Sequence, residues 1–166
     1  MLKRINSVTI FCAKFGLFLS FTVMLGSVMI QVVGRLNGSS PVWTEELTRY
    51  GLLFTISFGA GLAFRTGDLV AVDILTESLP VRFARLLRLF GAISTAALCF
   101  YLLPHAWKYV SIGRMQTSPA LGVRMHLIHL SIWITLICLG VFASLRVLDI
   151  IILKTSGRPI KQDIEG

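Results

Sequence analysis

Charge is scarce in this chain, and acidic charge is scarcer still. Only 14% of the 166 residues are charged, and 8 acidic residues stand against 16 Lys and Arg. The basic residues lie singly or in small groups beside apolar runs, without aromatic interleaving, so the net charge of +8 does not indicate a nucleic-acid partner. The central part of each apolar run has no Asp, Glu, Lys or Arg, which excludes a proton relay or ion site built from this chain alone.

The side chains of common catalytic motifs are also missing. Cys12, Cys99 and Cys138 are too far apart for a C-x-x-C pair, which excludes a disulfide-forming oxidoreductase and favours small apolar packing residues. The sequence has no Gly-rich phosphate loop and no nucleophile constellation. We therefore expect a protein that is not an enzyme and that has no metal and no cofactor.

Apolar residues, by contrast, are abundant. They make up 55% of the chain, and the mean hydropathy of +0.79 is well above that of a soluble domain. They form four long runs separated by stretches that carry nearly all the charge, which is the layout of a polytopic membrane protein. We predict an all-α integral membrane fold, one domain over residues 1–166, with four transmembrane helices at about 15–33, 47–64, 84–103 and 125–147.

The distribution of Lys and Arg predicts the orientation. Eleven of the 16 lie in the N-terminus, the middle loop and the C-terminus, and five lie within residues 34–49 and 104–124. The positive-inside rule then predicts that both termini are cytoplasmic in a bacterial inner membrane.

The start of the second helix is marked by a turn-rich stretch. Ser40 is a plausible N-cap, and Pro41 suits the first helical position. The short second apolar run, residues 50–64, needs extension through Leu47 to span a bilayer.

Polar and aromatic residues follow at this membrane edge. Glu45 and Glu46 precede Arg49 by four and three residues, a spacing that predicts ion pairs on one helix. Trp43 is an interfacial anchor beside them. Two interpretations stay open: a solvated helix end, or a subunit interface in which Trp43, Glu46 and Arg49 meet a partner.

Small residues recur on the second helix at spacings that permit close helix contact. The pairs are Ser57 with Gly61 and Gly59 with Ala63. They fit internal packing and docking to another chain equally well, and we count Gly59 and Ala63 with the candidate subunit interface.

The stretch over residues 66–80 has apolar and polar residues on different helical faces, with Asp73 on the polar one. It predicts an amphipathic helix along the cytoplasmic surface between the second and third spans. Together with Asp73, three arginines at three-residue spacing are candidates for anchoring to phospholipid head groups: Arg82, Arg85 and Arg88.

Three histidines lie toward the predicted outer surface. His126 and His129 share a helical face and, with His105, could be drawn as a haem or metal site. Haem histidines would more usually sit deeper and on facing helices, so we interpret these three as interfacial polar residues.

Several motifs in a fixed order resemble one family. They are the run from Pro41 to Arg49 (PVWTEELTR), the short Gly/Ala-rich span that ends in GAGLAFR at Arg65, and the downstream VAVD and LP at residues 70–73 and 79–80. This order resembles the small membrane subunit, the DctQ-like family, of tripartite ATP-independent periplasmic (TRAP) transporters. The second half of the chain resembles it only in length, topology and hydropathy, and Gly67-Asp68 departs from the expected basic stretch.

The resemblance implies a scaffold in a secondary transport system. It implies a stable heterodimer with a large membrane subunit, transient docking of a periplasmic substrate-binding protein, and sodium-driven uptake of an organic acid such as a sialic acid or a C4-dicarboxylate. The family signature would fall on Trp43, Glu46 and Arg49, and its cytoplasmic acidic position on Asp73. The alternative, based on the histidines, is a membrane anchor subunit of a haem-containing respiratory complex.

Overall fold

A computed structural model describes residues 2–39, 41–66 and 80–152 of the chain. Four long helices make up most of them: α1 (Leu2–Leu36), α2 (Val42–Thr66), α4 (Val81–Ile112) and α5 (His126–Ile152), with a short 3-10 turn, η1 (Gly113–Met115), after α4. Each of the four helices is long and apolar enough to cross a membrane. The predicted all-α fold with four spanning helices is therefore confirmed.

The helices extend past the predicted apolar segments. The third segment was expected to end before Pro104, but α4 continues through this proline to Ile112. The predicted surface helix falls largely on residues 67–79, which lie outside the described residues.

The connection between α1 and α2 is a tight turn. Gly38 adopts a φ of +75°, a conformation that glycine reaches without steric strain. The Ser39 N–H donates to the Gly34 carbonyl at 2.9 Å, which ends α1. On the other side, the Thr44 hydroxyl donates to the Pro41 carbonyl at 2.6 Å in the first turn of α2. The predicted N-cap, Ser40, lies outside the described part of the chain.

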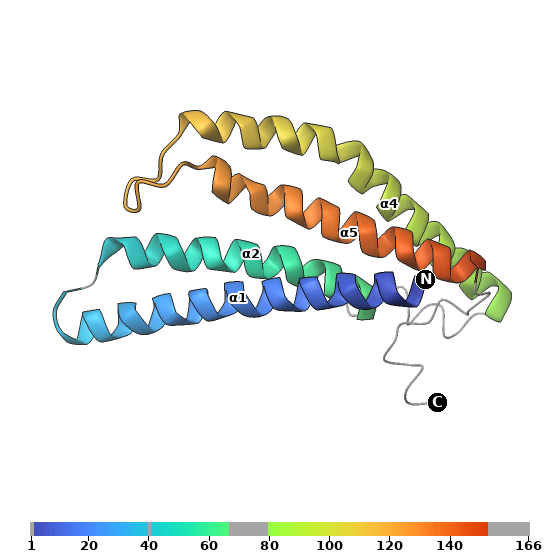
Figure 1. The fold of residues 1–166 in the computed structure, drawn as a ribbon, viewed down its shortest axis with the longest axis horizontal. Helices are drawn as coiled ribbons and strands as arrows, with labels where there is room; N and C mark the ends of the chain where they lie inside the picture. Colours follow the sequence, from blue (N-terminus) through green and yellow to red (C-terminus); the bar gives the residue numbers. More distant parts are fainter. Residues whose placement is uncertain (1, 40, 67–79, 153–166) are drawn as a thin grey trace.

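The four helices lie side by side in one layer, in the order α1, α2, α5, α4 (Figure 1). Helix α1 packs on α2, α2 on α5, and α5 on α4. The turn after α1 and the connection from α4 to α5 are at one end of this layer, which we call the loop end. The opposite end, where α2 finishes and α4 begins, is the terminal end.

A layer one helix thick has little interior. The buried apolar cluster is small and lies toward the terminal end, where Ala13, Phe64, Phe142, Ala143 and Leu145 meet. The edge helices α1 and α4 expose large apolar side chains, with Phe18 70% and Phe90 69% exposed. Such surface suits lipid tails or the helices of another membrane protein.

Candidate functional site at the loop end

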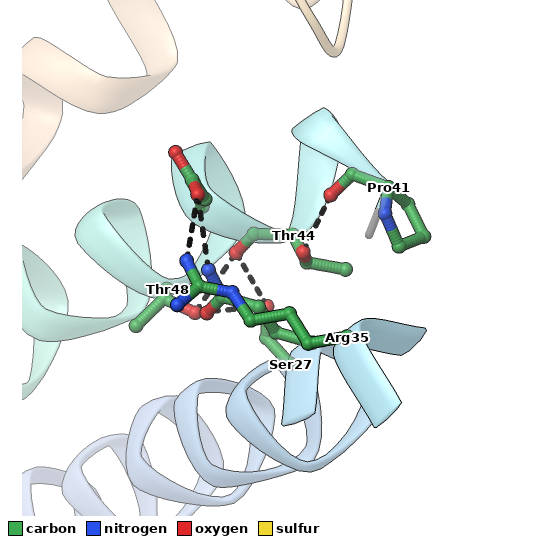
Figure 2. A network of polar contacts seen from close by, with 7 residues as sticks. Ser27, Arg35, Pro41, Thr44 and Thr48 are labelled. Atoms are coloured by element: carbon green, nitrogen blue, oxygen red, sulfur yellow. Dashed lines mark hydrogen bonds and ion pairs between the residues drawn. The ribbon is translucent and has the colours of Figure 1, made fainter. Parts of the chain in front are cut away.

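The signature segment, residues 41–49, begins α2 and binds the loop end of α1 through polar contacts (Figure 2). Ser27 of α1 donates to the Thr44 carbonyl at 2.8 Å, and the Thr48 hydroxyl donates to Ser27 Oγ at 3.0 Å. Thr44 is fully buried and Ser27 nearly so. The two threonines of the signature therefore fasten α2 to α1 within this chain.

Glu45 also contacts α1. Its Oε1 accepts from Gln31 at 3.2 Å and forms an ion pair with Arg35 at 3.3 Å. The side chains of Arg35 and Glu45 are 65% and 53% exposed, so water competes with the pair and its contribution to stability is about 0–1 kcal/mol.

Glu46 makes a different kind of contact. Its Oε2 accepts a hydrogen bond from the Ser118 hydroxyl and two more from the main-chain N–H groups of Ala120 at 3.3 Å and Leu121 at 3.2 Å. Ser118, Ala120 and Leu121 belong to the connection between α4 and α5, more than 70 residues further along the chain. One carboxylate therefore ties the start of α2 to a distant loop.

That loop has a defined shape. An antiparallel bridge joins Thr117 to Arg124, and the Ser118 N–H donates to the Val123 carbonyl at 2.8 Å. Gly122 closes the turn with a φ of +64°. The turn leaves the amides of Ala120 and Leu121 directed at the Glu46 carboxylate, an arrangement in which neutral donors hold an anion.

No salt bridge within 4 Å joins Glu45 or Glu46 to Arg49 in the part of the chain that the structure describes, although the charge of Arg49 still acts on the Glu46 carboxylate. Glu45 pairs with Arg35, and Glu46 binds the loop. Arg49 is exposed, and Trp43 is 38% exposed. Six residues separate Trp43 from Arg49, which places them about 120° apart around α2. Of these three residues, Glu46 binds a loop of the same chain, whereas Trp43 and Arg49 are exposed, and their predicted role in a subunit interface stays a prediction.

The small residues of α2 serve internal packing at two positions. The Ser57 hydroxyl donates to the Ser131 carbonyl of α5 at 2.8 Å. A Cβ added at Gly61 would lie 2.9 Å from Cβ of Cys138 and from a ring carbon of Phe142, so only glycine lets α5 approach this closely. Gly59 faces the other way, toward Leu17 of α1.

The terminal end holds most of the buried charge that the structure describes. Arg65 at the end of α2 forms an ion pair with Asp149 of α5 at 2.6 Å. Arg146, which is 6% exposed, donates to the Phe64 carbonyl at 3.5 Å, and its guanidinium lies 5.6 Å from the centre of the Phe64 ring. Sequence reasoning missed Asp149, although an acidic residue within an apolar run is a recognised signal.

Two of the predicted lipid anchors contact the chain itself. Arg85, which is half-buried, donates to the Ile150 carbonyl of α5 at 2.5 Å, and Arg88 is only 7% exposed. The anchoring of Arg85 and Arg88 to lipid head groups stays a prediction. The side chain of Arg82 and all of Asp73 lie outside the described residues.

The histidines near the loop end are engaged by aromatic neighbours. The His129 ring stacks on Tyr109 at a centroid distance of 4.2 Å, and its Nδ1 lies 3.3 Å from the Tyr109 carbonyl. His105 is tilted against Tyr101, and their ring centroids are 5.5 Å apart. Across residues 2–39, 41–66 and 80–152, no group of three or more His, Cys, Asp or Glu side chains could hold a metal ion.

A groove between α1 and α2 offers no reactive groups. It has a volume of about 310 Å³, with Gly16, Ser20 and Gly51 among its smaller lining residues and Phe54 and Phe58 among its larger ones. No charged side chain lines it, so it suits an apolar neighbour rather than a polar substrate.

Comparison with known proteins identifies the family of this chain. Residues 24–153 match the model of a family described as "Tripartite ATP-independent periplasmic transporters, DctQ component". The chain belongs to this family. It is therefore a multi-pass inner membrane protein and a component of a transport system, and the predicted family resemblance is confirmed.

One curated relative is the ectoine TRAP transporter small permease protein TeaB of Halomonas elongata. It is 27% identical to this chain over 123 residues, which covers 72% of this chain. The chain spans 63% of the length of that relative.

Proposed function

We propose that this chain is the scaffold subunit of a TRAP transporter. It holds the large transport subunit in a stable heterodimer, while a soluble substrate-binding protein docks transiently. The observation that carries the proposal is the layer of four helices, whose polar side chains join its own helices and whose edges expose broad apolar surface. A wide and rigid layer suits a fixed frame against which a transport domain moves.

The loop end faces the periplasm in this proposal, and both termini are cytoplasmic. The support is the charge asymmetry, with 11 of 16 Lys and Arg on the side of the termini. The loop that Glu46 holds would then be exposed to the periplasm.

In the function that we propose, the transported solute is a small organic acid of the sialic acid or C4-dicarboxylate class, and it is taken up with sodium. The relationship to TeaB adds ectoine as a candidate solute. Selectivity would belong to the large subunit and the binding protein, because no charged side chain lines the groove between α1 and α2.

The interface with the large subunit would include Trp43 and Arg49, with Ala63 further along α2. Gly59, the other small residue of the predicted interface, faces Leu17 of α1 and so packs within the chain. Trp43 and Arg49 are the exposed members of the signature triad, and neither is needed for the contacts between α1 and α2 described above. The candidates for contact with phospholipid head groups are Arg82, Arg85, Arg88 and Asp73.

Capture and uptake test this function together. The chain is co-expressed with the large subunit, purified by a tag on the small subunit, and reconstituted with an inward sodium gradient. The binding protein is added with sialic acid, a C4-dicarboxylate or ectoine. We expect capture of the large subunit, and uptake of one solute only when all three proteins are present. Uptake by this chain alone, or failure of capture, would contradict the proposal.

The same capture assay tests the interface residues. Trp43→Ala and Arg49→Ala should each lower the yield of the large subunit severalfold. Lys108→Ala, which removes another exposed cation at the loop end, is the matched control. Equal capture by all three variants would show that Trp43 and Arg49 do not form the interface.

A further inference from the structure

The contact between Glu46 and the loop between α4 and α5 depends on a group that can take up a proton. Three donors reach the same oxygen, Oε2: the Ser118 hydroxyl and the main-chain N–H groups of Ala120 and Leu121. A main-chain N–H can donate but cannot accept, so two of these three partners have a fixed role. The contact in this form therefore requires that Oε2 carry no proton.

Protonation of Glu46 weakens this contact at either oxygen. A proton on Oε2 would face the N–H hydrogens of Ala120 and Leu121. A proton on Oε1 leaves Oε2 as a neutral acceptor, and hydrogen bonds to a charged acceptor are about twice as strong as those to a neutral one. The loop is therefore held more weakly by the neutral acid than by the carboxylate.

The loop can leave α2 without unfolding, because hydrogen bonds of its own maintain its shape. The Ser118 N–H donates to the Val123 carbonyl at 2.8 Å, and the Gly122 N–H donates to the Ser118 carbonyl at 3.0 Å. At the base of the loop, the Met125 N–H donates to the Gln116 carbonyl at 2.9 Å. Loss of the Glu46 contact would release the tip of the loop and leave this turn intact.

Charged and titratable groups on the elements around Glu46 could also respond to pH. Arg49 of α2 acts on the carboxylate through its charge, and Arg35 of α1 pairs with Glu45. The loop and the start of α5 add two arginines and two histidines: Arg114, Arg124, His126 and His129. Arginine stays charged, and histidine changes charge at a higher pH than a carboxyl group does. Among these groups, only Glu45 and Glu46 therefore change charge between mildly acidic and strongly acidic pH.

We propose that Glu46 is an acid-sensitive switch that releases the loop over residues 117–124 from α2. The contact is present while Glu46 is charged, and it is lost as the pH falls and the carboxylate takes up a proton. Glu46 and its three donors belong to one chain, so the switch does not depend on the proposed transport function.

Hydrogen exchange of the full chain in detergent tests the switch at neutral pH and at about pH 3, below the usual range for glutamate. Protection is measured for each amide as its exchange rate relative to an unstructured chain at the same pH. The Ala120 amide should lose protection about tenfold in acid, and the Ser118 and Gly122 amides inside the turn should keep theirs. Ala120 is the most direct probe, because the Leu121 N–H also lies 3.3 Å from Ser118 Oγ.

Two variants separate Glu46 from its neighbours. Glu46→Gln places a neutral group of the same shape against the loop, so Ala120 should be as weakly protected at neutral pH as it is in the wild-type chain in acid. Acid should cause no further change in this variant. Glu45→Gln is the matched control, because it removes the adjacent carboxylate, which pairs with Arg35, and it should respond to acid as the wild-type chain does.

The neutral-pH comparison decides the proposal even if acid unfolds the whole subunit. Wild-type protection of Ala120 in Glu46→Gln at neutral pH would overturn the switch. A loss of protection in acid that is the same in Glu46→Gln and in the wild-type chain would assign the response to another group and would also overturn it. Failure of the wild-type chain to capture the large subunit would overturn the scaffold function and would leave the switch intact.

Discussion

Helix α2 is fastened at each end of the layer through a carboxylate, at one end to the loop between α4 and α5 and at the other to α5, and the partners of the two carboxylates differ. At the loop end, Glu46 accepts from one hydroxyl and two main-chain amides. At the terminal end, Asp149 pairs with Arg65 at 2.6 Å, and these side chains are 23% and 11% exposed. Neutral donors hold a charge near water, and a cation holds one that helices largely enclose. The comparison teaches that the exposure of each carboxylate to water decides whether neutral donors or a cation bind it.

Between these two ends, a neutral hydrogen bond joins α2 to α5. Ser57 donates to the Ser131 carbonyl, and Gly61 allows close approach nearby. Charge is expensive at the middle of a bilayer, and close packing is the main attraction available there.

The largest loss of stability should follow from removing the ion pair at the terminal end. Asp149→Ala strands Arg65 among packed helices, and removal of one partner of a buried pair costs roughly 3–5 kcal/mol. The partial exposure of both side chains favours the lower part of this range. Thermal unfolding of the purified subunit in detergent measures the loss.

The double variant Arg65→Met/Asp149→Leu is the control. It replaces the pair by apolar side chains of similar size and should regain most of the lost stability, because no charge is left stranded. A double variant as unstable as Asp149→Ala would mean that the ion pair itself supplies the stability.

A smaller and more local change in structure should follow from removing the Glu46 carboxylate at the loop end. Glu46→Ala removes the acceptor that holds Ser118, Ala120 and Leu121, so the loop should open while the helices stay packed. Hydrogen exchange measures this directly: the amides of Ala120 and Leu121 should exchange faster, and those of α5 beside Ser131 should not change. Unchanged exchange in the loop would show that its bridge suffices without Glu46.

The smallest effect should come from Arg35→Ala. Its pair with Glu45 is 65% and 53% exposed, so the loss should be about 0–1 kcal/mol and should vanish at high salt. The same unfolding assay at low and high salt checks it. A loss of stability equal to that of Asp149→Ala would show that the ion pairs at the two ends contribute equally.

Much of the fold could be predicted from the sequence. Four apolar runs are long enough to span a bilayer, and this property is local, so the helices were found correctly. The exact extent of α4 was not predicted correctly, because the helix continues through Pro104. A proline is tolerated within a long helix when neighbouring groups satisfy the freed carbonyl, and the sequence does not show these neighbours.

The candidate site was harder to predict because its partners are distant in sequence. The helical spacing predicted that Glu46 pairs with Arg49, whereas the structure shows that Glu46 accepts a hydrogen bond from Ser118, 72 residues away in the sequence. Arg88 at three-residue spacing from Arg85 matched a lipid anchor, and only the packing of α4 on α5 shows that it is buried. Spacing along one helix predicts which side chains are neighbours, and it does not predict which of them another helix or loop will engage.

The order of the helices in the layer also has a consequence for synthesis. The ribosome makes α1 and α2 first, and they can pair at once, since their contacts lie within the first 66 residues. Helix α4 follows, but it packs on α5, which is made after it. Until α5 enters the membrane, α4 lacks the helix on which it packs, and Arg65 lacks Asp149. A chain that stops at residue 125 therefore leaves the α1–α2 hairpin apart from α4, and α5 is the helix that joins them.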